Sequence, residues 1–138
     1  MTDSGGHPIM FSDDDPMLIR VREIALGFPG ADVKISHGRP AFFTKKVFCY
    51  YGGSIKVDGS YQQHEQSIIV GAEADERPAL VEDPRCYVPA YLGAYGWVGI
   101  DLDADTDWTE VTELIDASYR LTAGGKRLIA ELDLRRAG

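Results

Sequence analysis

The sequence lacks asparagine, has only two cysteines and contains no long apolar run. Without asparagine there is no acceptor for N-linked glycosylation. Cys49 and Cys86 have neither a C-x-x-C spacing nor a nearby histidine pair, which predicts free, partly buried thiols in a reducing compartment. No stretch approaches the roughly 20 consecutive apolar residues that a membrane span requires. We therefore expect a cytoplasmic protein with no membrane partner.

Basic residues are also scarce, because 14 lysines and arginines stand against 22 acidic residues and give a net charge of −8. Such a field repels phosphate, which works against general affinity for nucleic acid or anionic membranes. The basic residues are unevenly distributed along the chain, however. Residues 33–57 contain five basic residues and no acidic one. This segment is therefore where a local contact with an anionic partner is expected.

The length of 138 residues suits one domain, and a hydrophobic content of 44% is that of a globular protein. The first residues are rich in Gly, Ser and Asp and show no basic region followed by an apolar one. We expect a flexible leader at residues 1–13 and a folded domain at residues 14–138.

The apolar pattern predicts a helix, several strands, a helix, a strand and two more helices. Helical spacing of apolar residues predicts helices at residues 16–26, 76–82, 107–122 and 126–135. Runs rich in β-branched and aromatic residues predict strands at residues 33–36, 41–44, 47–51, 67–70 and 96–102. Residues 52–66 are expected to form a long loop or an irregular hairpin extension. Strands at hairpin spacing without regular βαβ alternation predict an α+β domain, an antiparallel β-sheet packed against helices.

Two patterns resemble ligand motifs but lack their defining residues. The alternating aspartates of residues 101–107 resemble the start of a calcium loop. Thr106 and Thr112 occupy the positions where an EF-hand requires Gly and Glu. The glycines of residues 93–99 do not have the G-x-G-x-x-G spacing of a dinucleotide site. The sequence therefore predicts no metal and no cofactor.

The acid-free segment gives the leading functional prediction, a binding module that contacts DNA or RNA. Its candidate contacts are Lys34, Arg39, Lys45 and Lys46, which lie on a predicted hairpin and on the turn before it. Each lysine or arginine that reaches a phosphate releases counterions and so contributes to affinity.

Two alternatives come from other classes of protein. The first is a small-molecule-binding protein or enzyme, whose pocket would combine His37 and Arg39 with Tyr95 and Trp97. The other reading of His37 and Arg39 is a specialised turn in which both side chains bond to backbone. His7 and His64 fall in predicted loops, where we expect them to be solvated, and no nucleophile has an adjacent base, so no catalytic residue is identified.

The second alternative is a domain that binds a protein partner. Its contact would be the aromatic connector at residues 86–95, which includes Tyr91. A large exposed apolar patch around Tyr91 would favour this function, whereas burial of Tyr91 would count against it.

Three segments resemble the MmcQ/YjbR family. They are residues 34–42, with the sequence KISHGRPAF; residues 87–89 and 95–100, with YVP and YGWVGI; and residues 119–121 and 126–128, with YRL and KRL. The resemblance covers nearly all of residues 15–132, with Gly124-Gly125 where relatives usually place Ala-Pro. It implies an α+β fold similar to the sheet-and-helix layer of CyaY, a frataxin-like protein. It also implies DNA binding, through analogy of fold.

Overall fold

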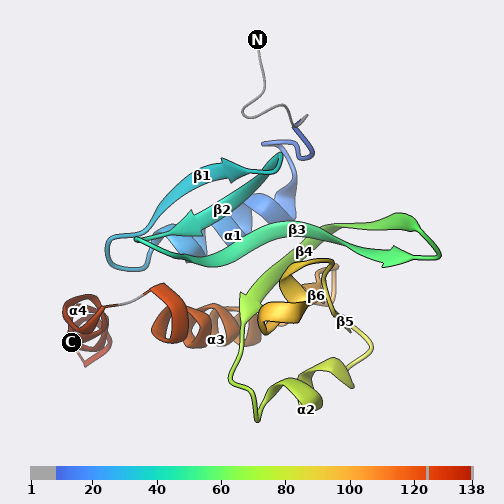
Figure 1. Ribbon diagram of the computed structural model, residues 1–138. Coiled ribbons are helices and arrows are strands. Elements are labelled where there is room, and N and C mark those ends of the chain that lie inside the picture. The colour runs from blue at the N-terminus through green and yellow to red at the C-terminus, as the bar shows by residue number, and fades with distance from the viewer. Residues whose placement is uncertain (1–8, 124, 138) are drawn as a thin grey trace.

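In the computed structural model, which describes residues 9–123 and 125–137, six strands form one antiparallel sheet in the order β1-β2-β3-β4-β6-β5 (Figure 1). The strands are β1 (Asp32–Ser36), β2 (Arg39–Phe43), β3 (Val47–Val57), β4 (Ser60–Gly71), β5 (Cys86–Tyr87) and β6 (Trp97–Asp101). The helices are α1 (Pro16–Leu26), α2 (Arg77–Val81), α3 (Trp108–Ser118) and α4 (Lys126–Ala137), with a 3₁₀ turn η1 (Leu92–Tyr95) and a π-helical turn η2 (Tyr119–Ala123). The predicted α+β class is confirmed.

Helices α1 and α3 begin at aspartates that act as N-caps. Asp15 accepts a hydrogen bond from the backbone N–H of Met17, and Pro16 occupies the first position of α1. Proline is tolerated there because the first amides of a helix have no internal partner. Asp107 caps α3 in the same way, accepting from the amides of Thr109 and Glu110.

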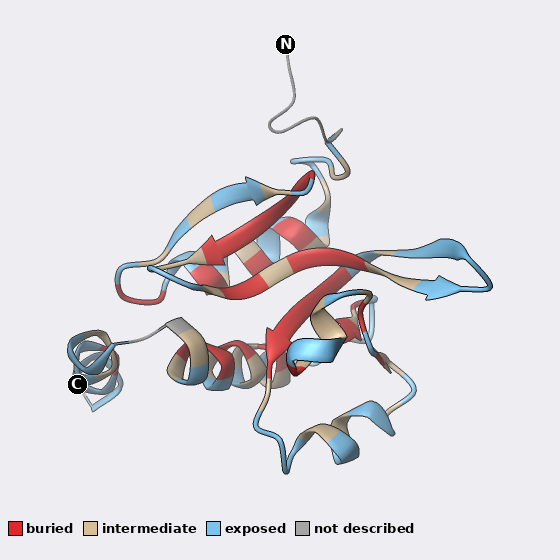
Figure 2. Ribbon diagram, in the orientation of Figure 1, coloured by how far each residue is buried: buried red, intermediate tan, exposed pale blue. Residues whose placement is uncertain are grey.

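Tight turns join β1 to β2 and β3 to β4. His37 and Gly38 connect the first pair and Asp58 and Gly59 the second, and all four residues have positive φ. Two consecutive residues with positive φ match the twist of a two-residue hairpin. Of the two expectations for residues 52–66, the irregular hairpin extension is confirmed. The register of β3 and β4 shifts between Tyr51 and Gly53, and the far end of the hairpin protrudes from the body as an exposed arm (Figures 1 and 2).

One face of the sheet packs on α1 and α3, which lie behind it in Figure 1. Alternate residues along the strands point to this face. The buried core comprises Phe42, Cys49, Tyr51, Ile68, Val70, Val98 and Ile100 from the sheet with Leu18, Val21, Ala25, Val111 and Ile115 from the two helices. This apolar layer holds the helices against the sheet.

The opposite surface of the sheet is called the open face below. The strand register places Lys34, Ala41, Tyr50, Ile69 and Gly99 in one row across it. The turn η1 lies in front of this face at the β4 and β6 end (Figure 1). At the β1 to β3 end, where Figure 1 shows no helix, Lys34 is exposed and Tyr50 is half-buried, whereas Arg39 and Ala41 are buried.

Residues 9–15 lie against the domain. The amide of Met10 donates to the carbonyl of Gly38 at 2.9 Å, and Phe11 packs on the core. Residues 1–8 of the expected leader, His7 among them, lie outside the described residues. Among the helices that the structure describes, none is long and apolar enough to cross a membrane.

Candidate functional site

Three of the four predicted basic contacts surround the end of β2. Lys34 is exposed on β1, and its Nζ lies 4.9 Å from the centroid of the Phe43 ring. Lys45 and Lys46 are exposed in the turn that follows β2, where the amide of Thr44 donates to the carbonyl of Lys46. Of the three cations, Lys34 lies beside the half-buried ring of Phe43, and Lys45 and Lys46 follow the end of the same strand, β2.

Arg39, the fourth predicted contact, is buried. Its side chain hydrogen-bonds to Gln63 and lies across Gly52, where an added Cβ would stand 2.3 Å from Nη1. Burial lowers the pKa of Arg39, while the nearby carboxylate of Glu65 acts to raise it. Arg39 therefore ties β2 to the β3–β4 hairpin and is not free to contact phosphate.

Two aromatic rings lie together on the open face. The centroids of Tyr50 and Trp97 are 5.4 Å apart, and the rings meet edge to face at 71°. Both side chains are half-buried, so each ring keeps part of its surface exposed. Burial raises the pKa of Tyr50 above its usual value. Aromatic pairs of this geometry are mutually stabilising and give a firm surface for a planar ligand.

The residues of the alternative pocket are spread over the sheet. His37 is exposed in the β1–β2 turn, whereas Trp97 belongs to β6, and two strands separate β2 from β6. Strand spacing makes that separation about 14 Å. Tyr95 is 82% exposed on η1. Two hollows among the described residues, of about 460 and 390 Å³, have none of these four residues in their lining.

A polar cluster that the sequence did not indicate lies where β4, β5 and β6 meet. Nδ1 of His64 is 2.7 Å from Oδ1 of Asp101, and the His64 ring stacks on Tyr87 with centroids 4.0 Å apart. The Tyr87 hydroxyl bonds to Ser67 Oγ at 2.7 Å. Our expectation of a solvated His64 is wrong, because β4 continues through the region where a loop seemed equally compatible with the sequence.

Two glycines make room for the Tyr87 ring. An added Cβ at Gly99 would lie 2.2 Å from Tyr87 Cζ, and one at Gly53 would lie 2.6 Å from its hydroxyl oxygen. Such separations are below van der Waals contact, so a larger residue would displace the ring. Burial raises the pKa of Tyr87 to about 12. The ring therefore acts as a neutral cover on the sheet.

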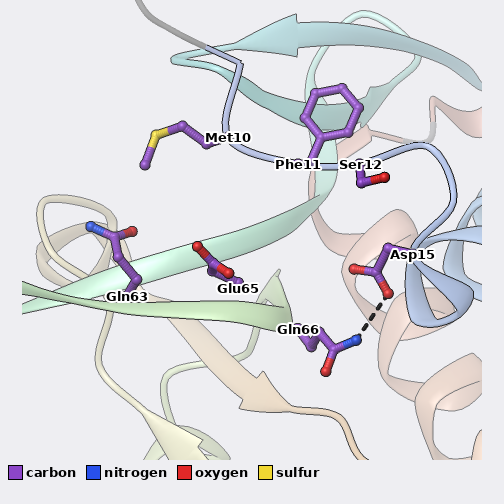
Figure 3. A pocket seen from close by; sticks show the side chains of 7 residues that line it. All are labelled: Met10, Phe11, Ser12, Asp15, Gln63, Glu65 and Gln66. Carbon is purple, nitrogen blue, oxygen red and sulfur yellow. Dashed lines mark hydrogen bonds between the residues drawn. The ribbon is translucent and has the colours of Figure 1, made fainter.

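The larger hollow lies between the N-terminal segment and β4 (Figure 3). Met10, Phe11 and Ser12 form one side, while Gln63, Glu65 and Gln66 form the other, with Asp15 at the end. Oδ1 of Asp15 accepts from Gln66 at 3.0 Å, and Oδ2 accepts from the Tyr51 hydroxyl at 2.5 Å. Burial acts to raise the pKa of Asp15, but these hydrogen bonds and that of the Met17 amide outweigh it and lower the pKa. Both carboxylate oxygens of Asp15 thus serve the fold.

An exposed aromatic patch lies beside the protruding hairpin. Tyr91 is 76% exposed, and its hydroxyl is 2.6 Å from that of Tyr61 on β4. Tyr95 and Val88 are also exposed. Tyr91 has φ of 64°, a conformation that costs a bulky residue energy and that is enriched at functional sites. This is the exposed surface that the protein-partner alternative requires.

Cysteine and carboxylate side chains do not gather into a metal centre in the described part of the chain. No group of three His, Cys, Asp or Glu residues there is placed to hold an ion. Both cysteines are free, and Cys49 is fully buried. Burial raises the pKa of both thiols, that of Cys86 to about 11. Asp103 accepts a bond from the backbone amide of Asp105, which gives the alternating aspartates a structural role.

Comparison with known proteins agrees with this architecture. No curated protein matches the chain. A family model described as YjbR matches residues 26–121, which include every strand of the sheet. Since the match extends over more than half of the sequence, the chain belongs to the YjbR family.

Proposed function

We propose that this protein binds single-stranded nucleic acid on the open face of the sheet. The observation that carries the proposal is the pair of half-exposed rings, Tyr50 and Trp97, on the same face as Lys34. Aromatic rings bind any base by stacking, and cations beside them bind the sugar–phosphate chain. An unpaired strand can present both of these groups together.

Three lysines supply the phosphate contacts in this proposal. Lys34, Lys45 and Lys46 are exposed at the β1 to β3 end, whereas Arg39 is assigned a structural role because it is buried against Gln63. Each phosphate contact on a single strand lowers the salt slope of log K by about 0.7. Three contacts therefore give a slope of about −2.

The net charge of −8 limits how strong this binding can be. The negative field opposes the approach of a polyanion at long range, and it is screened beyond about 10 Å at 0.1 M salt. We therefore expect weak binding that depends on the local rings and cations. The preference for single strands over duplexes follows because base pairs hide the faces that the rings would stack on.

A salt titration of binding to a fluorescent oligothymidylate and to a duplex of equal length tests the proposal. The wild type should prefer the single strand, Lys45→Glu with Lys46→Glu should weaken binding and flatten the slope, and Trp97→Leu should weaken binding without changing the slope. Lys126→Glu with Arg127→Glu, which replaces two exposed residues at the start of α4 and makes the same change in net charge, is the matched charge control. Equal affinity in all four proteins, or no binding at low salt, would overturn the proposal.

The second candidate function is binding of a protein partner through Tyr91 and Tyr95. Their exposures of 76% and 82% favour it, because large rings are seldom left in water without a use. A photo-crosslinking residue at position 95 tests it, with position 34 as control. A partner captured from position 95 alone, whose reconstituted binding is lost in Tyr95→Ser, would support this function. Capture at neither position would dismiss it.

A further inference from the structure

Arg77 on α2 is a partly buried guanidinium that lacks a protein partner. Its Nε is buried without an acceptor among the described residues, and no described carboxylate lies within ion-pair distance of its nitrogens. Five other arginines pair with carboxylates, namely Arg22, Arg85, Arg120, Arg135 and Arg136. Arg77 therefore differs from these five arginines.

Gly96 fixes the place of this guanidinium. Gly96 has φ of +92°, and an added Cβ would lie 3.0 Å from Nη1 and 3.1 Å from Cζ of Arg77. The planar group thus rests on the backbone of Gly96, and the positive φ and the short distances both require glycine there. Because the guanidinium is supported in this way, it loses less freedom on binding a ligand than a side chain in open solvent would.

The chemistry of an unpaired, partly buried guanidinium points to an oxyanion. Arginine stays protonated in proteins and presents its N–H donors as a rigid fork that matches two oxygens of a phosphate or carboxylate. Because Nε is itself buried, the donors that a ligand can reach are the two Nη groups, which form no ion pair with a described carboxylate. Such a pair is stronger than a neutral hydrogen bond.

The position of Gly96 in the chain indicates which class of oxyanion Arg77 would bind. Trp97 directly follows Gly96 and begins β6, and its ring meets Tyr50 on the open face, so the guanidinium beside Gly96 lies at the start of this strand. We propose that Arg77 binds a phosphate of a nucleotide whose base stacks on Trp97 and Tyr50. The assignment rests on the proposed function and extends it, because it places a phosphate contact at the β6 end of the open face.

Acidic residues near Arg77 set the expected strength. Glu73, Asp75 and Glu76 precede Arg77 in the chain and are exposed, and their charge disfavours an approaching anion. We therefore expect weak binding of a mononucleotide and a larger contribution of Arg77 within a strand, where the neighbouring nucleotides share the cost of association.

The test uses the full chain and three probes: thymidine 5′-monophosphate, thymidine and inorganic phosphate. Binding is followed through the arginine Nε–Hε signals in NMR spectra. In the wild type, the monophosphate should shift the Arg77 signal, thymidine should not, and inorganic phosphate should bind at least threefold more weakly than the monophosphate. A shift by inorganic phosphate of equal affinity would overturn the role of the base.

Variants complete the test. Arg77→Gln should weaken binding of the monophosphate at least tenfold, and Arg77→Lys about threefold or more, since lysine keeps the charge without the fork. Arg127→Gln, which removes an exposed arginine of α4, is the matched control and should bind as the wild type does. Unchanged monophosphate binding in Arg77→Gln would overturn the inference, provided that its thermal unfolding is that of the wild type. Gly96→Ala is a second variant that displaces the guanidinium while leaving Arg77 in place, and it should also weaken binding.

The oligothymidylate separates this inference from the function on which it rests. If the wild type fails to bind the strand but Arg77 still binds the monophosphate, the single-strand function is wrong and the phosphate site stands. If the strand binds Arg77→Gln and the wild type equally, the phosphate assignment is wrong and the open-face function stands.

Discussion

The two faces of the sheet differ in how their side chains are covered. On the face covered by α1 and α3, the helices remove Phe42, Ile68 and Val98 almost completely from water. On the open face, Tyr50 and Trp97 are covered only in part. The helix-covered face therefore supplies most of the hydrophobic stabilisation, and the open face carries chemistry that the fold does not consume.

The comparison extends to charge. Lys34 is exposed on the open face and Arg77 forms no ion pair among the described residues, whereas Arg120, Arg135 and Arg136 beside α3 and α4 engage carboxylates. A region that evolves only for stability pairs its buried donors. The open face thus differs from the helix-covered face in the partial exposure of its aromatic rings and in its exposed cation, and the proposed binding surface requires both.

Replacing a core ring on each face gives the largest expected contrast. Phe42→Ala removes a fully buried ring, and we expect a loss of about 3–5 kcal/mol in the free energy of unfolding. Tyr50→Ala removes a half-buried ring and should cost about 1 kcal/mol. Denaturant unfolding of both variants measures the difference. Equal losses would mean that the open face is as important for stability as the helix-covered face.

A glycine substitution tests the cover on the open face. Gly99→Ala forces a methyl group into the Tyr87 ring, and we expect a loss of about 1–3 kcal/mol from overpacking. Gly125→Ala is the control, because nothing lies within 4 Å of an added Cβ there, and it should be neutral or slightly stabilising. Thermal unfolding compares the two variants. A neutral Gly99→Ala would show that Tyr87 moves aside freely.

A smaller effect should appear at the N-cap of α1, on the helix-covered face. The lowered pKa of Asp15 means that its carboxylate stabilises the fold above the ordinary value of 3.8, and that this stabilisation is lost as the pH falls through the folded-state pKa. Asp15→Asn keeps a capping side chain but loses the charge, and it should cost about 1 kcal/mol at pH 7. The difference from the wild type should shrink below pH 3.8. A difference that is independent of pH would contradict the role of the charge.

The smallest expected effect on stability is at Lys34. Lys34→Gln removes a cation 4.9 Å from the Phe43 ring, which at an exposed site contributes about 0.5 kcal/mol. The same change should weaken oligothymidylate binding measurably, since it removes one phosphate contact. A variant that loses stability and keeps its binding would reverse the division of roles between the faces.

Local patterns predicted the elements well, and the residues explain why. Asp15 and Pro16 mark the start of α1, and Asp107 that of α3, because the first-turn amides of a helix need these partners. The Asp58-Gly59 pair is a turn signal of the same quality. It lies within a polar segment, which is why a loop and a hairpin extension both fitted residues 52–66.

The candidate site could be predicted only in part. The basic contacts Lys34, Lys45 and Lys46 are exposed as expected, but the burial of Arg39 depends on Gln63 and on the bend at Gly52, which lie on other strands. No sequence pattern singled out Arg77, because its proposed role depends on its contact with Gly96, which is distant in the chain. Contacts between residues that are distant in the chain cannot be read from spacing alone.

The order of the strands has a consequence for how the chain folds. Neighbouring strands from β1 to β4 are consecutive in sequence, so each pair can form from its own turn. By contrast, β6 pairs with β4 only after the intervening chain, with α2 and β5, has closed into a loop. Closing a longer loop costs more conformational entropy, and this cost must be met before the contacts between the loop ends can form. We expect pulse-labelled hydrogen exchange to show amide protection in β3 and β4 before β6, and simultaneous protection would contradict this. Trp97 and the backbone of Gly96 would then reach their places last, and the nascent chain would complete the proposed binding surface only in the final step of folding.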